Sequence, residues 1–178
     1  MHRVLFVCTG NIFRSLTAEY ALREVLGEAS KIQVASAGTE DFPHVVAPFV
    51  ADYLRSRGLD VSRHQRRTLT RKIIDEHDSV IAMSTEHRVI LAEHFNCADV
   101  LLFTEACGLE AQPLPDVHEA VEDHESNPAA VEAHVRSIID RIIDLTPRLA
   151  ARLVRDGHFK ESPTEVDPRA AMKETIPK

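Results

Sequence analysis

Short apolar runs alternate with amphipathic stretches along this chain, and the two patterns predict strands and helices in turn. Four apolar runs are typical of buried strands, at residues 3–8, 32–36, 79–83 and 100–103. Apolar positions at helical spacing predict helices between them, at residues 17–26, 47–57, 69–76 and 85–95. Gly27 and Gly58 are stop signals after two of these helices, and Thr70 and Ser84 are suited to cap the other two.

A longer helix is predicted to begin at Asn127 and Pro128, which are suited to the cap and the first helical position. We expect Pro147 to kink or end it. Residues 104–127 before it read as a loop, with seven acidic residues and no Lys or Arg. The apolar seam of the helix predicts packing on a sheet rather than a coiled coil, and its positions are Val131, Val135, Ile138, Ile142, Leu145 and Leu149.

Alternating strands and helices predict an α/β fold in three layers, with a four-stranded parallel sheet and helices on both faces. We expect one domain over residues 1–154. Residues 155–178 lose the periodicity and gain Pro, Glu and Lys, which is typical of a disordered tail. Ligands of such sheets bind beyond the carboxyl ends of the strands, so the loop between Val7 and Thr17 is the first place to look for a site.

That loop combines a cysteine, a glycine and an arginine in a pattern suited to anion binding. Cys8 ends the first strand, and Arg14 lies six positions later where a helix begins. Successive backbone N–H groups and the helix dipole form an anion cradle at such a junction, and we expect Gly10 to give the loop its unusual backbone conformation. Arg14 supplies a two-pronged donor that matches two phosphate oxygens. The same positive field favours a thiolate at Cys8, placed for in-line attack on phosphorus.

Composition and charge narrow the possibilities for the rest of the chain. The net charge is −7, and residues 1–75 carry 11 Lys and Arg against 8 Asp and Glu, so the acidic excess lies in the second part. This balance argues against a nucleic-acid partner. The apolar runs are far shorter than the roughly 20 residues of a membrane span, and the N-terminal run is too short for a signal peptide. Three cysteines make an odd, sparse set, which predicts a cytoplasmic protein without disulfides.

Residues 7–15, which read VCTGNIFRS, resemble the phosphate loop VCxGNICRS of the low-molecular-weight protein tyrosine phosphatases. Residues 36–39 (SAGT), 57–64 (RGLDVSRH) and 80–83 (VIAM) are similar to further motifs of that family. The resemblance covers about residues 1–154. It implies a flavodoxin-like sheet with strand order 2-1-3-4 and a hydrolase that forms a cysteinyl-phosphate intermediate, without a metal or other cofactor.

The resemblance also implies a general acid, which the family supplies as the aspartate of an Asp-Pro-aromatic motif between the fourth strand and the last helix. Asp167 is followed by a proline but lies in the tail. Asp116 lies in the loop after the fourth strand, so its position favours it although Val117 replaces the proline. His118 then falls near the aromatic residue that forms a wall of the substrate cleft.

Several other residues take roles by their match to the family motifs. The phosphate-binding loop comprises Thr9, Gly10, Asn11, Ile12, Phe13 and Ser15 besides the two catalytic residues. Ser36 and His64 match a hydrogen-bond network that shapes the loop and favours the thiolate. Three departures stand out: Phe13 replaces a second loop cysteine that protects the nucleophile, Leu16 replaces a proline, and Ser84 replaces an acidic residue.

The substrate implied by the resemblance is phosphotyrosine on proteins, with inorganic phosphate and related oxyanions as loop ligands. Ile12 presents an apolar wall to a phenyl ring, whereas the arginine phosphatases of the family carry a threonine there. Two alternatives stay open beside the arginine phosphatase. A thioredoxin-coupled arsenate reductase needs relay cysteines, for which Cys97 and Cys107 are candidates. The second alternative is a non-catalytic module that binds phosphopeptides. The sequence does not define the oligomeric state.

Ten histidines raise the question of a metal site. The pairs His87/His94 and His118/His124 lack the i,i+4 ligand spacing, and the chain has no HExxH motif. We therefore expect surface histidines and no metal.

Overall fold

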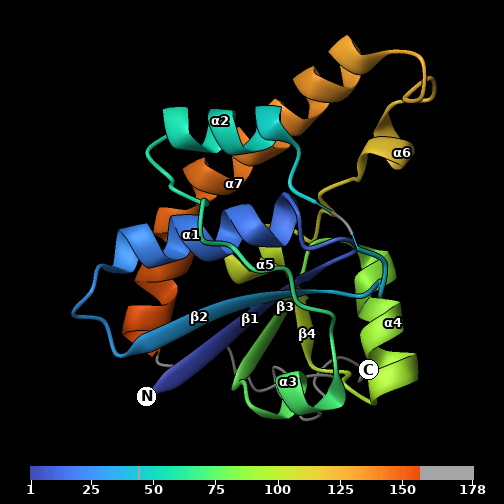
Figure 1. The fold of residues 1–178 in the computed structure, drawn as a ribbon. Coiled ribbons are helices and arrows are strands. Elements are labelled where there is room, and N and C mark those ends of the chain that lie inside the picture. Colours follow the sequence, from blue (N-terminus) through green and yellow to red (C-terminus); the bar gives the residue numbers. More distant parts are fainter. Residues whose placement is uncertain (44, 157–178) are drawn as a thin grey trace, which may run out of the picture.

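The computed structural model describes residues 1–43 and 45–156 of the chain. Its strands are β1 (His2–Cys8), β2 (Ile32–Gly38), β3 (Ser79–Ala82) and β4 (Val100–Leu102). Its helices are α1 (Arg14–Leu26), α2 (Pro48–Ser56), α3 (Arg71–Asp75), α4 (Thr85–Phe95), α5 (Phe103–Ala106), α6 (Val117–Ala120) and α7 (Pro128–Asp156). Figure 1 shows these elements along the chain.

The four strands form one parallel sheet in the order β2-β1-β3-β4, which confirms the predicted fold class and strand order. Cys8 at the end of β1 lies beside Gly38 at the end of β2, and Val7 lies beside Ala82 at the end of β3. Because the strands are parallel, the loops that follow them meet at one edge of the sheet. This edge holds the loop from Cys8 to Ser15.

Helices cover both faces of the sheet. Alternate residues of β1 point to opposite sides, and both sides are apolar, so each needs a packed layer. Phe6 packs in one apolar cluster with residues of α1, α2, α5 and α7, while Leu5 and Val7 pack in a second cluster with residues of α3 and α4. Every residue of the predicted seam of α7 is buried in the first cluster or packs against it. The sheet therefore lies between two helical layers (Figure 1).

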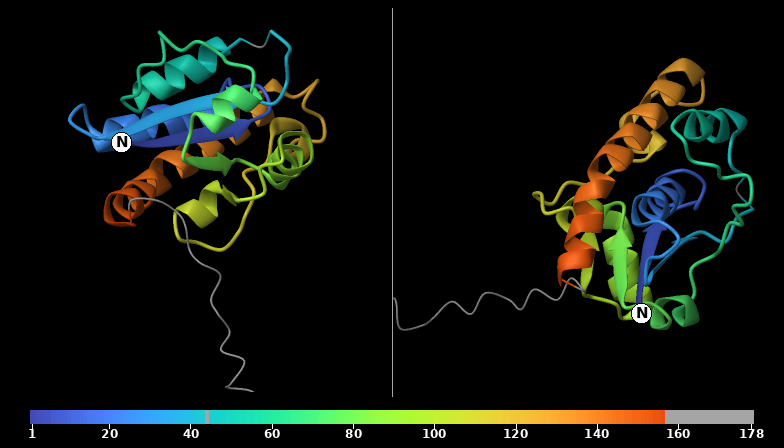
Figure 2. Two further views of the ribbon diagram at one scale, coloured as in Figure 1. Left: turned by 90° about the horizontal axis from the view of Figure 1, so that it is seen from below. Right: turned by 90° about the vertical axis from the view of Figure 1, so that its left-hand side faces the viewer.

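The prediction of a loop is wrong, and so is one of the two outcomes expected at Pro147, that the helix ends there. Pro147 does not end α7, which continues to Asp156 and spans the molecule (Figure 2). Leu149 and Leu153 are buried beyond the proline, so apolar packing outweighs the one backbone hydrogen bond that proline cannot make. Residues 104–127 contain two short helices, α5 and α6. The predicted tail at 155–178 lies almost wholly outside the described residues.

Other local signals are confirmed. The Thr70 side chain accepts a hydrogen bond from the backbone of Ile73 at the start of α3, and Ser84 precedes α4 as its cap. Asn127 accepts from the backbone of Ala130 in the first turn of α7. One boundary moves in a way that matters for the site: α1 begins at Arg14, so the guanidinium starts from the first turn of a helix.

Candidate active site

The loop between β1 and α1 turns back on itself through a left-handed residue. This residue is Asn11, with φ of 55°, and not Gly10 as expected. Asparagine tolerates this region better than most side chains because its short amide can bond locally. Here the amide is fully buried and bonded on every side, so the surroundings support the strained conformation.

A second glycine, Gly38, lets the loop lie against the end of β2. A Cβ at this position would come within 2.6 Å of the Thr9 carbonyl oxygen and 3.1 Å of the Asn11 nitrogen. Both atoms belong to the backbone, so no side chain can move to make room. The SAGT motif at residues 36–39 therefore contains a glycine that the loop requires.

The thiol of Cys8 is buried at the base of the loop, with 2% of the residue exposed. Its Sγ lies 2.9 Å from the Ser15 hydroxyl oxygen and accepts the Asn11 backbone N–H at 3.2 Å. Both contacts suit a sulfur that carries negative charge, because hydrogen bonds to the charged form stabilise it. The structure thus brings the predicted nucleophile and Ser15 together.

Asn11 joins the predicted supporting residues into one network. Its side-chain nitrogen donates to the hydroxyls of Ser15 at 3.0 Å and Ser36 at 2.7 Å. Its backbone carbonyl lies 3.0 Å from His64 Nε2, which must donate because a carbonyl only accepts. Burial lowers the pKa of His64, which favours a neutral ring, and the contact with the carbonyl places its one proton on Nε2. Ser36 in turn donates to the buried carboxylate of Glu19, a residue that the sequence analysis did not single out.

Arg14 is buried, with 1% of the residue exposed, and its guanidinium is held on two sides. Nη1 donates to the Leu114 carbonyl at 3.1 Å, and Nη2 donates to the Thr9 hydroxyl at 3.1 Å. Nη2 also pairs with the carboxylate of Asp116. Nε is buried and has no acceptor among the residues that the structure describes. Both terminal nitrogens of the arginine are therefore held by protein groups, and the buried Nε is the donor left for a ligand.

Asp116 reaches this site from the segment after β4, as predicted. It is the cap residue of α6: its Oδ1 accepts the Val117 N–H at 2.8 Å, and its own N–H donates to Glu119 at 2.6 Å. Its Oδ2 accepts from the Thr9 hydroxyl at 3.3 Å. The competing Asp167 lies outside the described residues.

Comparison with known proteins shows the family of the chain. The family model for the low molecular weight phosphotyrosine protein phosphatases matches residues 3–158. This chain belongs to that family.

Curated relatives of the family carry different activities. The chain is 30% identical over 92 residues to a probable low molecular weight protein-tyrosine-phosphatase EpsP of Ralstonia solanacearum, covering 51% of this chain and 62% of that protein. It is 35% identical over 83 residues to arsenate reductase 2 of Staphylococcus saprophyticus, covering 47% of this chain and 60% of that protein. The matched stretches thus span about three fifths of these relatives.

A solved structure supports the fold over a longer stretch. The YwlE arginine phosphatase from Geobacillus stearothermophilus superposes with a TM-score of 0.73 and 22% identity, over 92% of this chain and 99% of that one. At this identity the likeness bears on the fold alone.

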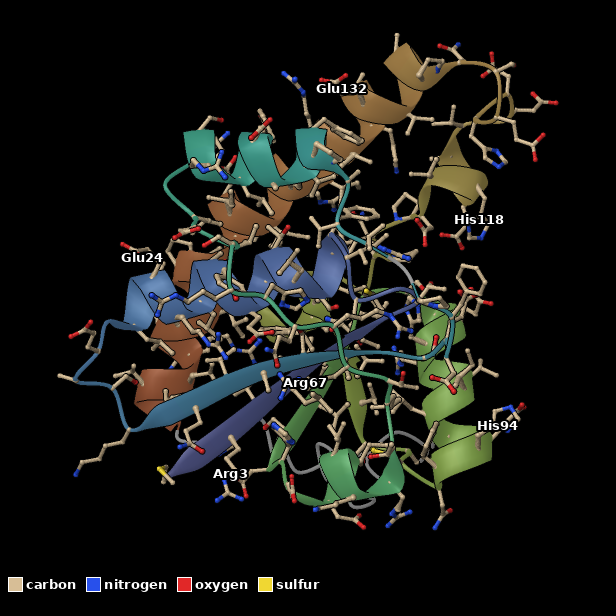
Figure 3. The ribbon with its side chains drawn as sticks, viewed as in Figure 1. Arg3, Glu24, Arg67, His94, His118 and Glu132 are labelled. Atoms are coloured by element: carbon tan, nitrogen blue, oxygen red, sulfur yellow. The ribbon has the colours of Figure 1, made fainter. Side chains whose placement is uncertain are left out.

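The remaining residues matched to the family surround the loop at different depths. Ile12 is partly buried, while Phe13 is buried and lies against Arg14, whose guanidinium carbon is 5.5 Å from the ring centroid. His118 is exposed on α6 (Figure 3), and its ring nitrogen lies within 4.8 Å of carboxylate oxygens of Glu86 and Glu119. His118 therefore lies at the surface beside Glu86 of α4 and Glu119 of α6, and all three of these groups are exposed.

The expectation that the histidines lie on the surface is wrong for His87, because only 1% of this residue is exposed. The residue is in the first turn of α4, where its ring lies between Ser84 and Thr9. Burial, together with the positive charge of Arg14, lowers the pKa of His87 to about 3. The sequence does carry one signal for it: a cap serine three positions before a histidine, directly after a strand that ends at the ligand edge.

Proposed function

We propose that this chain hydrolyses phosphotyrosine on proteins through a cysteinyl-phosphate intermediate. The observation that carries the proposal is the meeting of Arg14 and Asp116, which are 102 positions apart, at the loop that holds Cys8. A nucleophile, an anion-binding arginine and a carboxyl group at one place are the parts that phosphoryl transfer needs.

The phosphoryl group is proposed to bind in the cradle of the loop. Backbone N–H groups at the start of α1, the helix dipole and the buried Nε of Arg14 supply positive charge without assistance from another group. These donors are preorganised, so they stabilise charge on the equatorial oxygens as the reaction proceeds.

The reaction is proposed to have two steps. In the first, the Cys8 sulfur attacks phosphorus, the bond to the tyrosine oxygen breaks, and Asp116 gives its proton to that oxygen. In the second, Asp116 takes a proton from water, the water oxygen attacks phosphorus, and the bond to sulfur breaks. The Ser15 hydroxyl, 2.9 Å from the sulfur, stabilises the thiolate as it leaves.

The residues at and around the loop favour a tyrosine phosphatase over the two alternative enzymes, an arginine phosphatase and an arsenate reductase. Ile12 offers no hydroxyl to assist attack on a phosphoarginine, and its apolar side chain suits a phenyl ring. Relay of a disulfide in an arsenate reductase needs thiolates, but burial raises the pKa of Cys107 to about 12 and also raises that of Cys97. The intact Asp116 argues against a module that only binds phosphopeptides, since binding alone requires no proton donor.

We also propose that residues 1–154 form the catalytic domain and that the protein acts in the cytoplasm. All three cysteines, Cys8, Cys97 and Cys107, are free thiols, which suits a reducing compartment. No helix among the described residues is long and apolar enough to cross a membrane.

A comparison of substrates tests the proposal. The purified chain is offered a phosphotyrosine peptide, a phosphoarginine peptide and arsenate with thioredoxin, each in the presence of a metal chelator. We expect release of phosphate from phosphotyrosine, its loss in Cys8→Ser, and no change in Cys97→Ser. Arsenate reduction that depends on Cys97 or Cys107, or faster turnover of phosphoarginine than of phosphotyrosine, would contradict it.

A further inference from the structure

His87 is a buried histidine that forms a direct hydrogen bond with the loop that holds the nucleophile. Its Nε2 lies 3.0 Å from the Thr9 hydroxyl oxygen. Its Nδ1 lies 3.1 Å from the backbone nitrogen of Ser84 and 2.8 Å from the Ser84 hydroxyl. The ring therefore links the start of α4 to the first residue after Cys8.

The partners of the ring determine which nitrogen carries the proton. A backbone N–H only donates, so Nδ1 of His87 must accept from Ser84 with a free lone pair. The proton of a neutral ring is then on Nε2, and Nε2 donates to the Thr9 oxygen. Burial is the largest cause of the low pKa of His87, and the charge of Arg14 adds to it while that of Asp116 opposes it. The ring therefore stays neutral near neutral pH and keeps this tautomer.

The bonds of the Thr9 hydroxyl can now be assigned completely. Its oxygen has two lone pairs and one hydrogen. One lone pair accepts from His87 Nε2 and the other accepts from Arg14 Nη2 at 3.1 Å. The hydroxyl makes a third contact, with Asp116 Oδ2 at 3.3 Å. Because both lone pairs are used, the hydroxyl hydrogen is donated to this carboxylate oxygen.

We propose that His87 is a positioning residue for the general acid: its Nε2–H fixes the Thr9 hydroxyl so that this group donates to Asp116 and holds the carboxyl at the mouth of the loop. This inference rests on the proposed function, because it assumes that Asp116 is the proton donor. When a phosphoryl group takes Arg14 as its partner, the Thr9 hydroxyl is the contact that still ties Asp116 to the loop.

Two substitutions of His87 separate this role from a purely structural one. In His87→Gln the amide nitrogen takes approximately the place of Nε2, so a donor to Thr9 is kept and the contact with Ser84 is lost. In His87→Asn the amide group takes approximately the place of Nδ1, so the contact that caps α4 is kept and the donor to Thr9 is lost. A positioning role predicts damage in His87→Asn, whereas a capping role predicts damage in His87→Gln.

The readout is the dependence of kcat/KM on the leaving group, measured with phenyl phosphate and 2,4-dinitrophenyl phosphate. Dinitrophenolate leaves without a proton, so its release does not need the acid. We expect His87→Asn to lower kcat/KM for phenyl phosphate by about tenfold and to leave that for the dinitrophenyl ester within about twofold, because a misplaced catalytic group costs rate only where it acts. His87→Gln should match the wild type on both substrates.

The outcomes keep this inference separate from the proposed function. If Cys8→Ser turns over as fast as the wild type, the proposed function fails. If turnover depends on Cys8 and Asp116 but His87→Asn keeps the wild-type ratio between the two substrates, only the role of His87 is overturned. Equal losses on both substrates, or a larger loss in His87→Gln, would assign a structural role and overturn it too.

A spectroscopic measurement on the wild-type chain tests the inference without a variant. Long-range ¹H–¹⁵N spectra distinguish a protonated ring nitrogen from one with a free lone pair. We expect His87 to show a proton on Nε2 and a free Nδ1 from pH 5 to pH 8. A proton on Nδ1, or a charged ring in this range, would overturn the assignment even if both variants fail to fold.

Discussion

The guanidinium of Arg14 and the carboxylate of Asp116 form an ion pair with little exposure to water: 2% of the arginine side chain and 17% of the aspartate side chain are accessible. Burial of such a pair has a desolvation cost in free energy, and removal of one partner destabilises the protein because it leaves a buried charge without compensation. A phosphate that enters the loop competes with Asp116 for the same guanidinium. Binding of the anion and release of the carboxyl group are therefore linked events in the proposed reaction.

Arg14→Lys should abolish phosphate binding, because an ammonium group cannot replace the planar fork that bridges two oxygens. Inorganic phosphate at about 100 times its Kd should stabilise the wild type by about 2.7 kcal/mol. We expect little or no phosphate-dependent rise in Tm for Arg14→Lys, measured by thermal denaturation with and without phosphate. Arg63→Lys, on the exposed surface, is the control and should respond as the wild type does. An unchanged rise in Arg14→Lys would contradict the assigned anion site.

Asp116→Asn removes the proposed proton donor while it keeps the shape of the side chain and an acceptor for the Val117 N–H. Because general acid catalysis contributes about 10²–10⁴-fold, kcat/KM for phenyl phosphate should fall by at least about 10²-fold. Steady-state kinetics at several pH values measure the effect, and Asp167, the aspartate that precedes a proline, supplies the control. Asp167→Asn should leave the rate unchanged, and a larger loss there than in Asp116→Asn would move the acid to the tail.

Gly38→Ala tests the close approach of β2 to the loop, because the added Cβ would come within 2.6 Å of the Thr9 carbonyl oxygen. We expect a loss of about 1–3 kcal/mol in the free energy of unfolding together with loss of phosphate binding. Gly27→Ala has a similar expected cost, about 1–3 kcal/mol, because Gly27 has a positive φ of 70° but open space around it. Urea denaturation and phosphate titration of both variants should separate them, and equal phosphate affinity would contradict the packing argument.

The stability of the chain should depend on pH through His87. Its pKa is about 3 in the folded protein and near 6.5 in an unfolded chain, so the unfolded state binds more protons between these values. The free energy of unfolding therefore falls as the pH falls, by about 2 kcal/mol between pH 6.5 and pH 4.5 from this residue alone. Urea denaturation of the wild type and His87→Gln should show that the variant lacks this part of the loss. The same pH dependence in both proteins would show that His87 does not stay neutral.

Much of the fold could be predicted from local patterns. The apolar runs mark the strands because each strand is buried on both faces, and alternation with helices implies a parallel sheet. The loop after β1 could be found because Cys8 and Arg14 lie at the junction where such sheets bind ligands. The helix does not end at Pro147 because packing of Leu149 and Leu153 opposes the local cost of the proline, and only the tertiary structure shows that packing.

The site residues that the sequence does not reveal are held in place by contacts between segments that are distant along the chain. His87 reads as one surface histidine among ten until the ends of β1 and β3 are brought together. The sequence favours Gly10 for the positive φ because glycine is the usual choice, whereas in the structure Asn11 has it, and the hydrogen bonds of its side chain hold that conformation. Glu19 gave no signal, since its partner Ser36 lies on another element.

The proposed reaction transfers a phosphoryl group to the sulfur of Cys8, and trapping of this cysteinyl-phosphate intermediate is its most direct test. Asp116→Asn should form the intermediate from 2,4-dinitrophenyl phosphate, which needs no acid, and should hydrolyse it slowly, because the base for water is gone. After a rapid quench and proteolysis, mass spectrometry is predicted to find a phosphoryl group on the Cys8 peptide. Turnover of the ester with the phosphoryl group on another residue, or on none, would contradict the account.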